Sequence, residues 1–304
     1  MTNMKTSKAV TPLAILIGLL TILRCGVGLF WQDGGSPFPF TTLHGQIIRM
    51  YGQGIYHFDP YFVAPILRGT DAVTLFIGVP LLVLATILYR RGSLRGAIFL
   101  TSLLVYFLYN AASYAFGVAY NNLFMVYLLS FSASLAAFIL AFRSIDQQDL
   151  AARVTPGFPY RGAAALLFLS AIGLLFAWLP DVMTGLLQGH AIAIDSYTTE
   201  VTYVLDLGII VPVLILTGVL LLRRAPASHL AAPILLIMLA LIGLVITAQC
   251  IAQSLAGITL GIGEFIGKAG SFMLLALIAV GLIVRMFRHI TGPPVTKSAG
   301  LKPA

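Results

Sequence analysis

The chain has 304 residues, of which 59% are hydrophobic and 9% are charged, and its formal net charge is +8. A soluble domain carries about 25% charged residues, so these charges could not coat a water-facing globule of this size. The composition therefore excludes an ordinary soluble protein and predicts that lipid surrounds much of the chain. The basic residues are spread over short loops and form no patch or tail, which argues against a nucleic-acid partner.

Eight apolar stretches predict an all-α, polytopic integral membrane protein. Each has close to the ~20 residues that a helix needs to cross the hydrocarbon core. Helices are expected because lipid-facing backbone must satisfy its own hydrogen bonds. The first stretch is expected to stay as an uncleaved span, since no small-residue cleavage site follows it. The predicted spans are Pro12–Trp31, Asp71–Tyr89, Ala97–Tyr120, Leu123–Phe142, Ala163–Leu179, Leu205–Leu222, Leu230–Ala256 and Phe265–Phe287.

The distribution of basic residues predicts the orientation of the bundle. Cytoplasmic loops of membrane proteins are enriched in Lys and Arg. With a cytoplasmic N-terminus, fourteen of the 18 Lys and Arg residues fall on the inner side: Lys5, Lys8, Arg90, Arg91, Arg95, Arg143, Arg153, Arg161, Arg223, Arg224, Arg285, Arg288, Lys297 and Lys302. We therefore expect both termini in the cytoplasm and the protein in a plasma membrane. The lack of an N-x-[ST] acceptor in the outer loops is compatible with a bacterial membrane.

Recurring landmarks predict that the chain is internally duplicated. Trp31 and Trp178 close the first and fifth predicted spans, and Arg143 and Arg288 follow the fourth and eighth. Asp71 with Pro80, and Asp206 with Pro212, mark the second and sixth spans in the same way. Four spans in each half keep both halves in one orientation, which predicts a parallel repeat about an axis along the membrane normal. The alternative is that such landmarks recur by chance in apolar sequence.

The spans divide the chain into two halves joined by a short linker. The predicted segments are an N-terminus (1–8), a first half (9–145) with a long outer loop (32–70), a cytoplasmic linker (146–161), a second half (162–290) and a disordered tail (291–304). The outer loop is aromatic and long enough to fold over the bundle, and Thr42–Tyr51 is predicted to form a short interfacial helix that Gly52 stops.

Ionisable residues inside the spans are the first candidates for a ligand site, because they are costly in hydrocarbon. Arg24 either extends outward to the interface or pairs with Asp71, Asp206 or Glu264. Asp71 and Asp206 have two interpretations as well. They are favoured N-cap residues for the second and sixth helices, or they face each other between the halves and bind a cation or amine.

Three further residues belong to this candidate site. Glu264 and Lys268 have the favourable i, i+4 order for a local ion pair. They lie in a glycine-rich stretch that could instead act as a hinge or gate. Asn110 belongs to a polar face of the third span, where it either joins a neighbouring helix or lines a cavity.

A metal site is a weak alternative, formed by the outer-loop histidines His44, His57 and His190. Their spacing matches no metal-binding motif, so ordinary loop histidines are favoured and no cofactor is expected. Two other histidines, His229 and His289, are expected to be solvated at the cytoplasmic end. Cys25 and Cys250 lie at similar depth and could form a disulfide, but buried free thiols are favoured.

No nucleotide-binding or hydrolase motif is present, and no substrate is named by the sequence. We expect a transporter or permease-like protein that binds a small polar, cationic or amphipathic molecule at an outward-facing site. The alternatives are a membrane-embedded enzyme acting on a lipid or an extracytoplasmic substrate, and an accessory membrane subunit. The lipid bilayer is the expected partner in each case, and the oligomeric state is left open.

Overall fold

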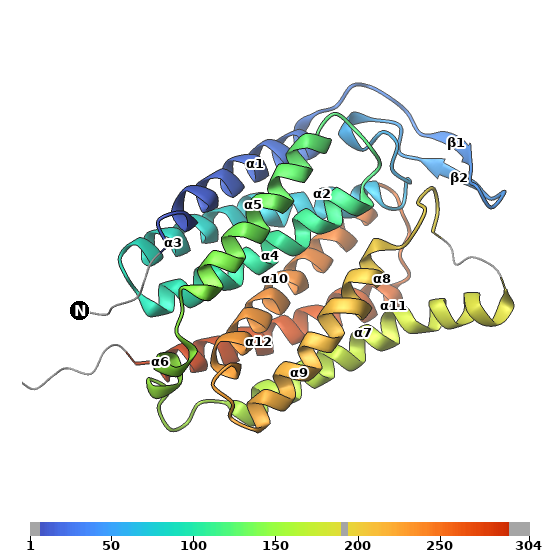
Figure 1. Ribbon diagram of the computed structural model, residues 1–304. Coiled ribbons are helices and arrows are strands. Elements are labelled where there is room, and N and C mark those ends of the chain that lie inside the picture. The colour runs from blue at the N-terminus through green and yellow to red at the C-terminus, as the bar shows by residue number, and fades with distance from the viewer. Residues whose placement is uncertain (1–6, 190–193, 292–304) are drawn as a thin grey trace, which may run out of the picture.

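The computed structural model describes residues 7–189 and 194–291, except for the side chain of Glu264. Within these residues, eight helices are long and apolar enough to cross a membrane, as the sequence predicted. They run side by side along one common direction (Figure 1). The fold is therefore that of an all-α, multi-pass membrane protein.

Three of the eight spans contain a π-helical segment. The helices are α1 (Val10–Phe30), α2 (Ala64–Val73) continuing through η2 (Thr74–Gly78) into α3 (Val79–Arg90), α4 (Leu94–Gly117), α5 (Phe124–Arg143), the short α6 (Gln147–Ala152), α7 (Tyr160–Gln188), α8 (Val201–Leu205) continuing through η3 (Asp206–Ile210) into α9 (Val211–Leu222), α10 (Ser228–Leu255), and α11 (Ile262–Phe265) continuing through η4 (Ile266–Gly270) into α12 (Ser271–Arg288).

The π-helical segments η2 and η3 lie just before prolines. Pro80 and Pro212 each follow their segment by two residues. Proline lacks a backbone N–H, and its ring clashes with the carbonyl four residues earlier in a regular α-helix. A wider turn before the proline relieves this clash, so both helices continue across the membrane.

The second and fifth spans are much longer than the sequence suggested. The second helix begins at Ala64, seven residues before Asp71, because Pro65 is well suited to the first turn of a helix. The fifth runs on to Gln188, where Gly189 ends it with a left-handed φ of 66°. Trp178 therefore lies inside this helix and does not close it, unlike Trp31, which directly follows α1.

The interfacial helix predicted at Thr42–Tyr51 is wrong. This segment belongs to an antiparallel hairpin of β1 (Phe38–Thr41) and β2 (Ile47–Met50), with Phe40 opposite Ile48. Its turn uses Gly45 at a φ of 77°, and the hydroxyl of Thr42 accepts a hydrogen bond from the N–H of Gln46. Aromatic and β-branched residues favour this extended pairing over a helix.

The eight spans form two groups of four with the same order of contacts. In the first group, α1 packs against α2, α3 and α5, and α4 packs against α3 and α5. In the second, α7 packs against α9 and α12, and α10 packs against α9 and α12. Between the groups, α10 packs against α2 and α4, and α8 packs against α4. The helices α4 and α10 are consequently the most buried spans.

One end of the bundle carries the start of α1, the end of α12 and the short helix α6, and the hairpin lies at the other end (Figure 1). At the first end, the Arg95 guanidinium donates to the carbonyl of Ile290 at 2.7 and 3.0 Å. His229 is buried and bonded to the Tyr160 hydroxyl at 2.8 Å, and His289 is half-buried and bonded to Thr155. The expectation that both histidines are solvated is therefore wrong for His229.

Close packing of α2 against α10 depends on Gly69. A Cβ atom at this position would lie 2.7 Å from the Ala248 carbonyl oxygen and 2.7 Å from Gln249 Cα, both backbone atoms. Gly69→Ala should therefore push the helices apart and destabilise the bundle by about 1–3 kcal/mol, as overpacking does. Thermal unfolding of the detergent-purified protein measures this loss. Gly173→Ala is the matched control, since nothing lies within 4 Å of its added methyl group. Equal midpoints for the two variants would contradict the predicted contact.

Candidate functional site

A buried ion pair joins the first two spans. Arg24 on α1 is 4% exposed, and its Nη2 atom lies 3.5 Å from Oδ1 of Asp71, which is fully buried. Of the two interpretations of Arg24, the structure supports pairing with Asp71 over extension to the interface. Pairing is the expected outcome, because an isolated charge at this depth would be costly.

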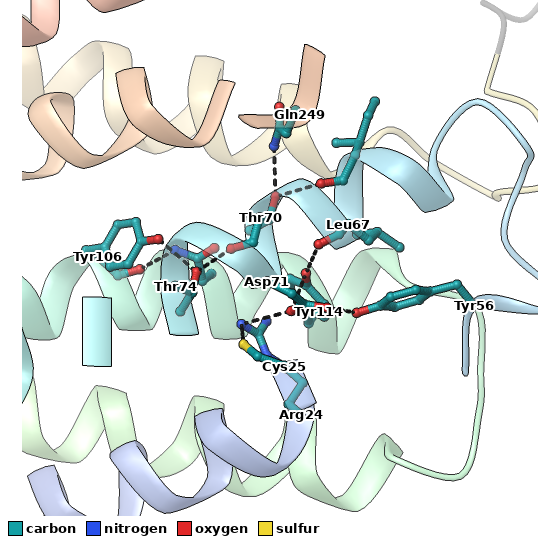
Figure 2. A network of polar contacts seen from close by, with 12 residues as sticks. Arg24, Cys25, Tyr56, Leu67, Thr70, Asp71, Thr74, Tyr106, Tyr114 and Gln249 are labelled. Carbon is teal, nitrogen blue, oxygen red and sulfur yellow. Dashed lines mark hydrogen bonds and ion pairs between the residues drawn. The ribbon is translucent and has the colours of Figure 1, made fainter. Parts of the chain in front are cut away.

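Asp71 is held by three donors in all (Figure 2). The hydroxyl groups of Tyr56 and Tyr114 donate to its two carboxylate oxygens, the second at 3.0 Å. The Tyr114 ring also lies under the Arg24 guanidinium, 3.7 Å from ring centroid to Cζ. Charge-assisted hydrogen bonds of this kind are stronger than neutral ones, and a cation over an aromatic face adds to them. The carboxylate is thus fully satisfied by the protein itself.

The same network extends toward the second half of the chain. The hydroxyl groups of Thr74 on η2 and Tyr106 on α4 are hydrogen-bonded at 2.8 Å. Within α4, Asn110 Nδ2 donates to the Tyr106 carbonyl at 2.9 Å. On the other side of α2, Gln249 of α10 donates to the Thr70 hydroxyl at 2.9 Å (Figure 2). On this face, Tyr106 and Tyr114 connect α4 to α2, whereas Asn110 bonds its own helix.

Asp206 lies in a different environment. It is 6% exposed and accepts hydrogen bonds from the Tyr109 hydroxyl and from Trp178 Nε1, both at 2.8 Å. The Trp178 ring stacks on Tyr203, with 4.8 Å between ring centroids. Within residues 7–189 and 194–291, the ion pairs are Arg24–Asp71 and Arg153–Asp149, so no basic side chain there pairs with Asp206.

Asp71 and Asp206 do not face each other. Their tyrosine partners Tyr114 and Tyr109 are five residues apart on α4, which places them about 140° apart around that helix. Neither acid is an N-cap, since their helices begin at Ala64 and Val201. Both expectations for these two residues are therefore corrected: the acids occupy separate sites on two sides of α4.

The remaining candidates have different outcomes. The side chain of Glu264 and all of His190 lie outside the described residues, so their predicted roles are untested. Lys268 lies in the π-helical segment η4. His44 is exposed and His57 packs between Phe38 and Phe58, and no metal-binding cluster occurs in the part of the chain that the structure describes. Cys25 and Cys250 are buried and are not joined by a disulfide, as favoured.

Sequence reasoning missed the aromatic partners of both acids. Tyr56, Tyr109 and Tyr114 come from a loop and from α4, and their distance from the acids along the chain gives no signal of contact. It also missed Asp59, a fully buried acid in the outer loop. Asp59 Oδ1 accepts hydrogen bonds from the N–H of Ala119 at 2.9 Å and the Tyr197 hydroxyl at 2.7 Å. Asp59 thereby links the loop between α1 and α2 to the connection between α4 and α5 and to the connection between α7 and α8.

Comparison with protein-family models, with curated proteins and with solved structures finds no match. The class that the fold defines is a polytopic α-helical membrane protein. Any finer assignment has to come from the chemistry of the two intramembrane acids.

Gly28 on α1 leaves the space that the Asp71 network occupies. A Cβ atom there would clash with Asp71 Oδ2 and would lie 2.7 Å from the Tyr56 hydroxyl oxygen. Gly28→Ala should displace the carboxylate from Arg24 and lower the unfolding midpoint strongly, because breaking one side of a buried pair costs about 3–5 kcal/mol. Gly26→Ala, whose methyl group meets nothing within 4 Å, should be close to wild type. A Gly28→Ala variant as stable as Gly26→Ala would argue against the network.

The buried carboxyl group of Asp59 should make stability depend on pH. Burial is the main cause that raises its pKa from 3.8 to about 7, and the two hydrogen bonds oppose this shift. Since the folded state holds the proton more tightly than the unfolded state, this contribution to stability is complete below pH ~4 and is lost as the pH rises to about 7. Asp59→Asn should remove the difference between unfolding midpoints at pH 5 and pH 8. Asp181→Asn, an exposed acid, should keep the wild-type difference; identical pH profiles in all three proteins would contradict the assignment.

Proposed function

We propose that this protein is a transporter or permease-like protein for a small cationic molecule, and that Asp206 binds the cation. One observation carries the proposal. Asp206 is a buried carboxylate inside a membrane span, and the described part of the chain supplies it with neutral donors only. Placing an ionised Asp side chain at the centre of a membrane span costs about 3 kcal/mol on scales of helix insertion. Such acids typically mark a pathway for an ion or a substrate.

The surroundings of Asp206 favour a cation over other ligands. The Trp178 and Tyr203 rings are both half-buried and stack beside the carboxylate. Aromatic faces attract ammonium groups, and tryptophan does so most strongly. Asp206 also begins the π-helical segment η3, and such segments are frequent at functional sites. A carboxylate with adjacent aromatic rings is chemistry that suits an organic amine or a quaternary ammonium ion.

Asp71 has a different role in this proposal. Its charge is compensated by Arg24, so a second cation would have to displace an ion pair to bind there. We assign the Arg24–Asp71 network to holding α1, α2 and α4 together, and we assign Asn110 no ligand contact at Asp206. Glu264 and Lys268 are kept as the hinge or gate at the start of the eighth span.

We further infer the topology of the protein. The Arg residues that end α3, α5 and α12 lie at the same end of the bundle as the start of α1 (Figure 1). The positive-inside rule supports a cytoplasmic location for this end and for both termini. The shared contact order of the two four-helix groups supports the 4+4 duplication. A bacterial plasma membrane is the setting that fits these features.

Tryptophan fluorescence offers a direct test of cation binding. The chain has two Trp residues, and Trp31→Phe leaves Trp178 as the single reporter beside Asp206. Tetramethylammonium and larger quaternary ammonium ions are titrated into this variant in detergent or nanodiscs. We expect saturable quenching or a spectral shift, because the cation would lie against the indole ring.

Adding Asp206→Asn to the Trp31→Phe background should abolish this response while the protein remains folded. The loss of a charged partner should weaken binding by about tenfold or more. Adding Asp181→Asn instead removes an exposed acid bonded to Tyr203 and should leave the response largely intact. Absence of any saturable response in Trp31→Phe alone, or an unchanged response after Asp206→Asn, would reject the proposed site.

A further inference from the structure

A small cavity lies inside the first group of four helices, between α1, α4 and α5. Its volume is about 10 Å³, which is room for about one water-sized particle. The side chains that line it are mostly polar although it is enclosed by membrane helices. They include Thr21, Arg24, Asn110, Tyr127, Ser130 and Ser134. The cavity is separate from Asp206, which does not line it.

Two serine hydroxyl groups in this cavity have no hydrogen-bond partner. Ser130 and Ser134 lie one turn apart on α5, are 7% and 0% exposed, and have fully buried Oγ atoms without a partner. Buried hydroxyl groups elsewhere in these helices behave differently. Ser102 donates to the Ile98 carbonyl and Ser170 donates to the Leu166 carbonyl, four residues earlier. Unsatisfied buried polar groups are rare in native proteins, and an unseen water or ion is a common reason for them.

The lining also includes the Arg24 guanidinium, which is paired with Asp71 but carries further N–H donors. The contacts of Arg24 with Asp71 and with Cys25 both use Nη2. A guanidinium carries five N–H donors, so further donors are available to a particle in the cavity that Arg24 lines. No carboxylate is among the lining residues. Asp71 does not line the cavity, and its carboxylate is bound by Arg24, Tyr56 and Tyr114.

We propose that this cavity is a binding site for a single small anion of halide size, held by Arg24 and by the hydroxyl groups of Ser130 and Ser134. A halide accepts several hydrogen bonds at once and donates none, which matches two orphaned hydroxyl donors beside a guanidinium. A water molecule is the competing occupant, because it can accept from these donors and donate to the lining oxygen atoms of Asn110 and the serines. The two occupants are separated by the response to chloride. The anion site does not depend on the cation site at Asp206, because the two are built from different helix faces.

Equilibrium dialysis of the full-length protein in detergent with radiolabelled chloride tests the proposal. Sodium gluconate keeps the ionic strength constant. We expect saturable binding of about one chloride per chain, and binding that is weakened about tenfold or more in the Ser130→Ala/Ser134→Ala double variant, which lacks both hydroxyl donors. Ser170→Ala is the matched control, because it removes a buried hydroxyl group that is already satisfied, and it should bind chloride like wild type.

Thermal unfolding in sodium chloride and in sodium gluconate provides a second readout that does not require the label. A bound anion should raise the unfolding midpoint of the wild type and of Ser170→Ala in chloride, but not that of the double serine variant. The double variant should remain folded, since Ser→Ala removes one atom from each side chain. The same midpoint in both salts, together with no saturable chloride binding by the wild type, would show that the cavity holds water only and would overturn the proposal. Asp206→Asn should not affect chloride binding, so the two proposals can fail separately.

Discussion

The cost of placing charge in hydrocarbon governs the polar architecture of this protein. Arg24 and Asp71 both lie inside membrane spans, and each would be expensive alone. Their pairing, with the Tyr56 and Tyr114 hydroxyl groups on the carboxylate and the Tyr114 ring under the guanidinium, spreads the charge over four groups. These groups come from α1, α2, α4 and the outer loop. The helices α1, α2 and α4 are therefore joined by a polar network that adds to their apolar packing.

The second half has a similar acid that no basic side chain contacts within the described residues. Asp206 accepts hydrogen bonds from Tyr109 and Trp178, and these neutral donors stabilise a carboxylate without neutralising it. Because Asp71 has a basic partner, its site is structural. Because Asp206 receives neutral donors, its site is the candidate for a ligand. The contacts of the two acids also explain why α4 is central: it supplies a tyrosine to each acid from a different face. The two groups of helices share an order of contacts, but Asp71 in the first group has a basic partner and Asp206 in the second has none among the described residues.

Apolar length predicted the eight spans well, because it is imposed by the bilayer and is local in sequence. The helix ends after Phe142 and Phe287 were predicted within a residue for the same reason. The prediction failed where helices extend beyond the hydrocarbon, as at Ala64 and Gln188, and where a loop forms a hairpin. The pairing of Arg24 with Asp71 was one of several options. Its choice depends on which helices touch, and a single sequence does not contain that information.

Infrared difference spectroscopy with tetramethylammonium tests the central claim most directly, because carboxylate bands report the bonding of individual acids. The account predicts a ligand-induced change in a carboxylate band of the wild type that disappears in Asp206→Asn. The same change should persist in the Asp181→Asn variant. A ligand-induced carboxylate change that survives unaltered in Asp206→Asn would contradict the account, because the cation would then be bound by a different acid.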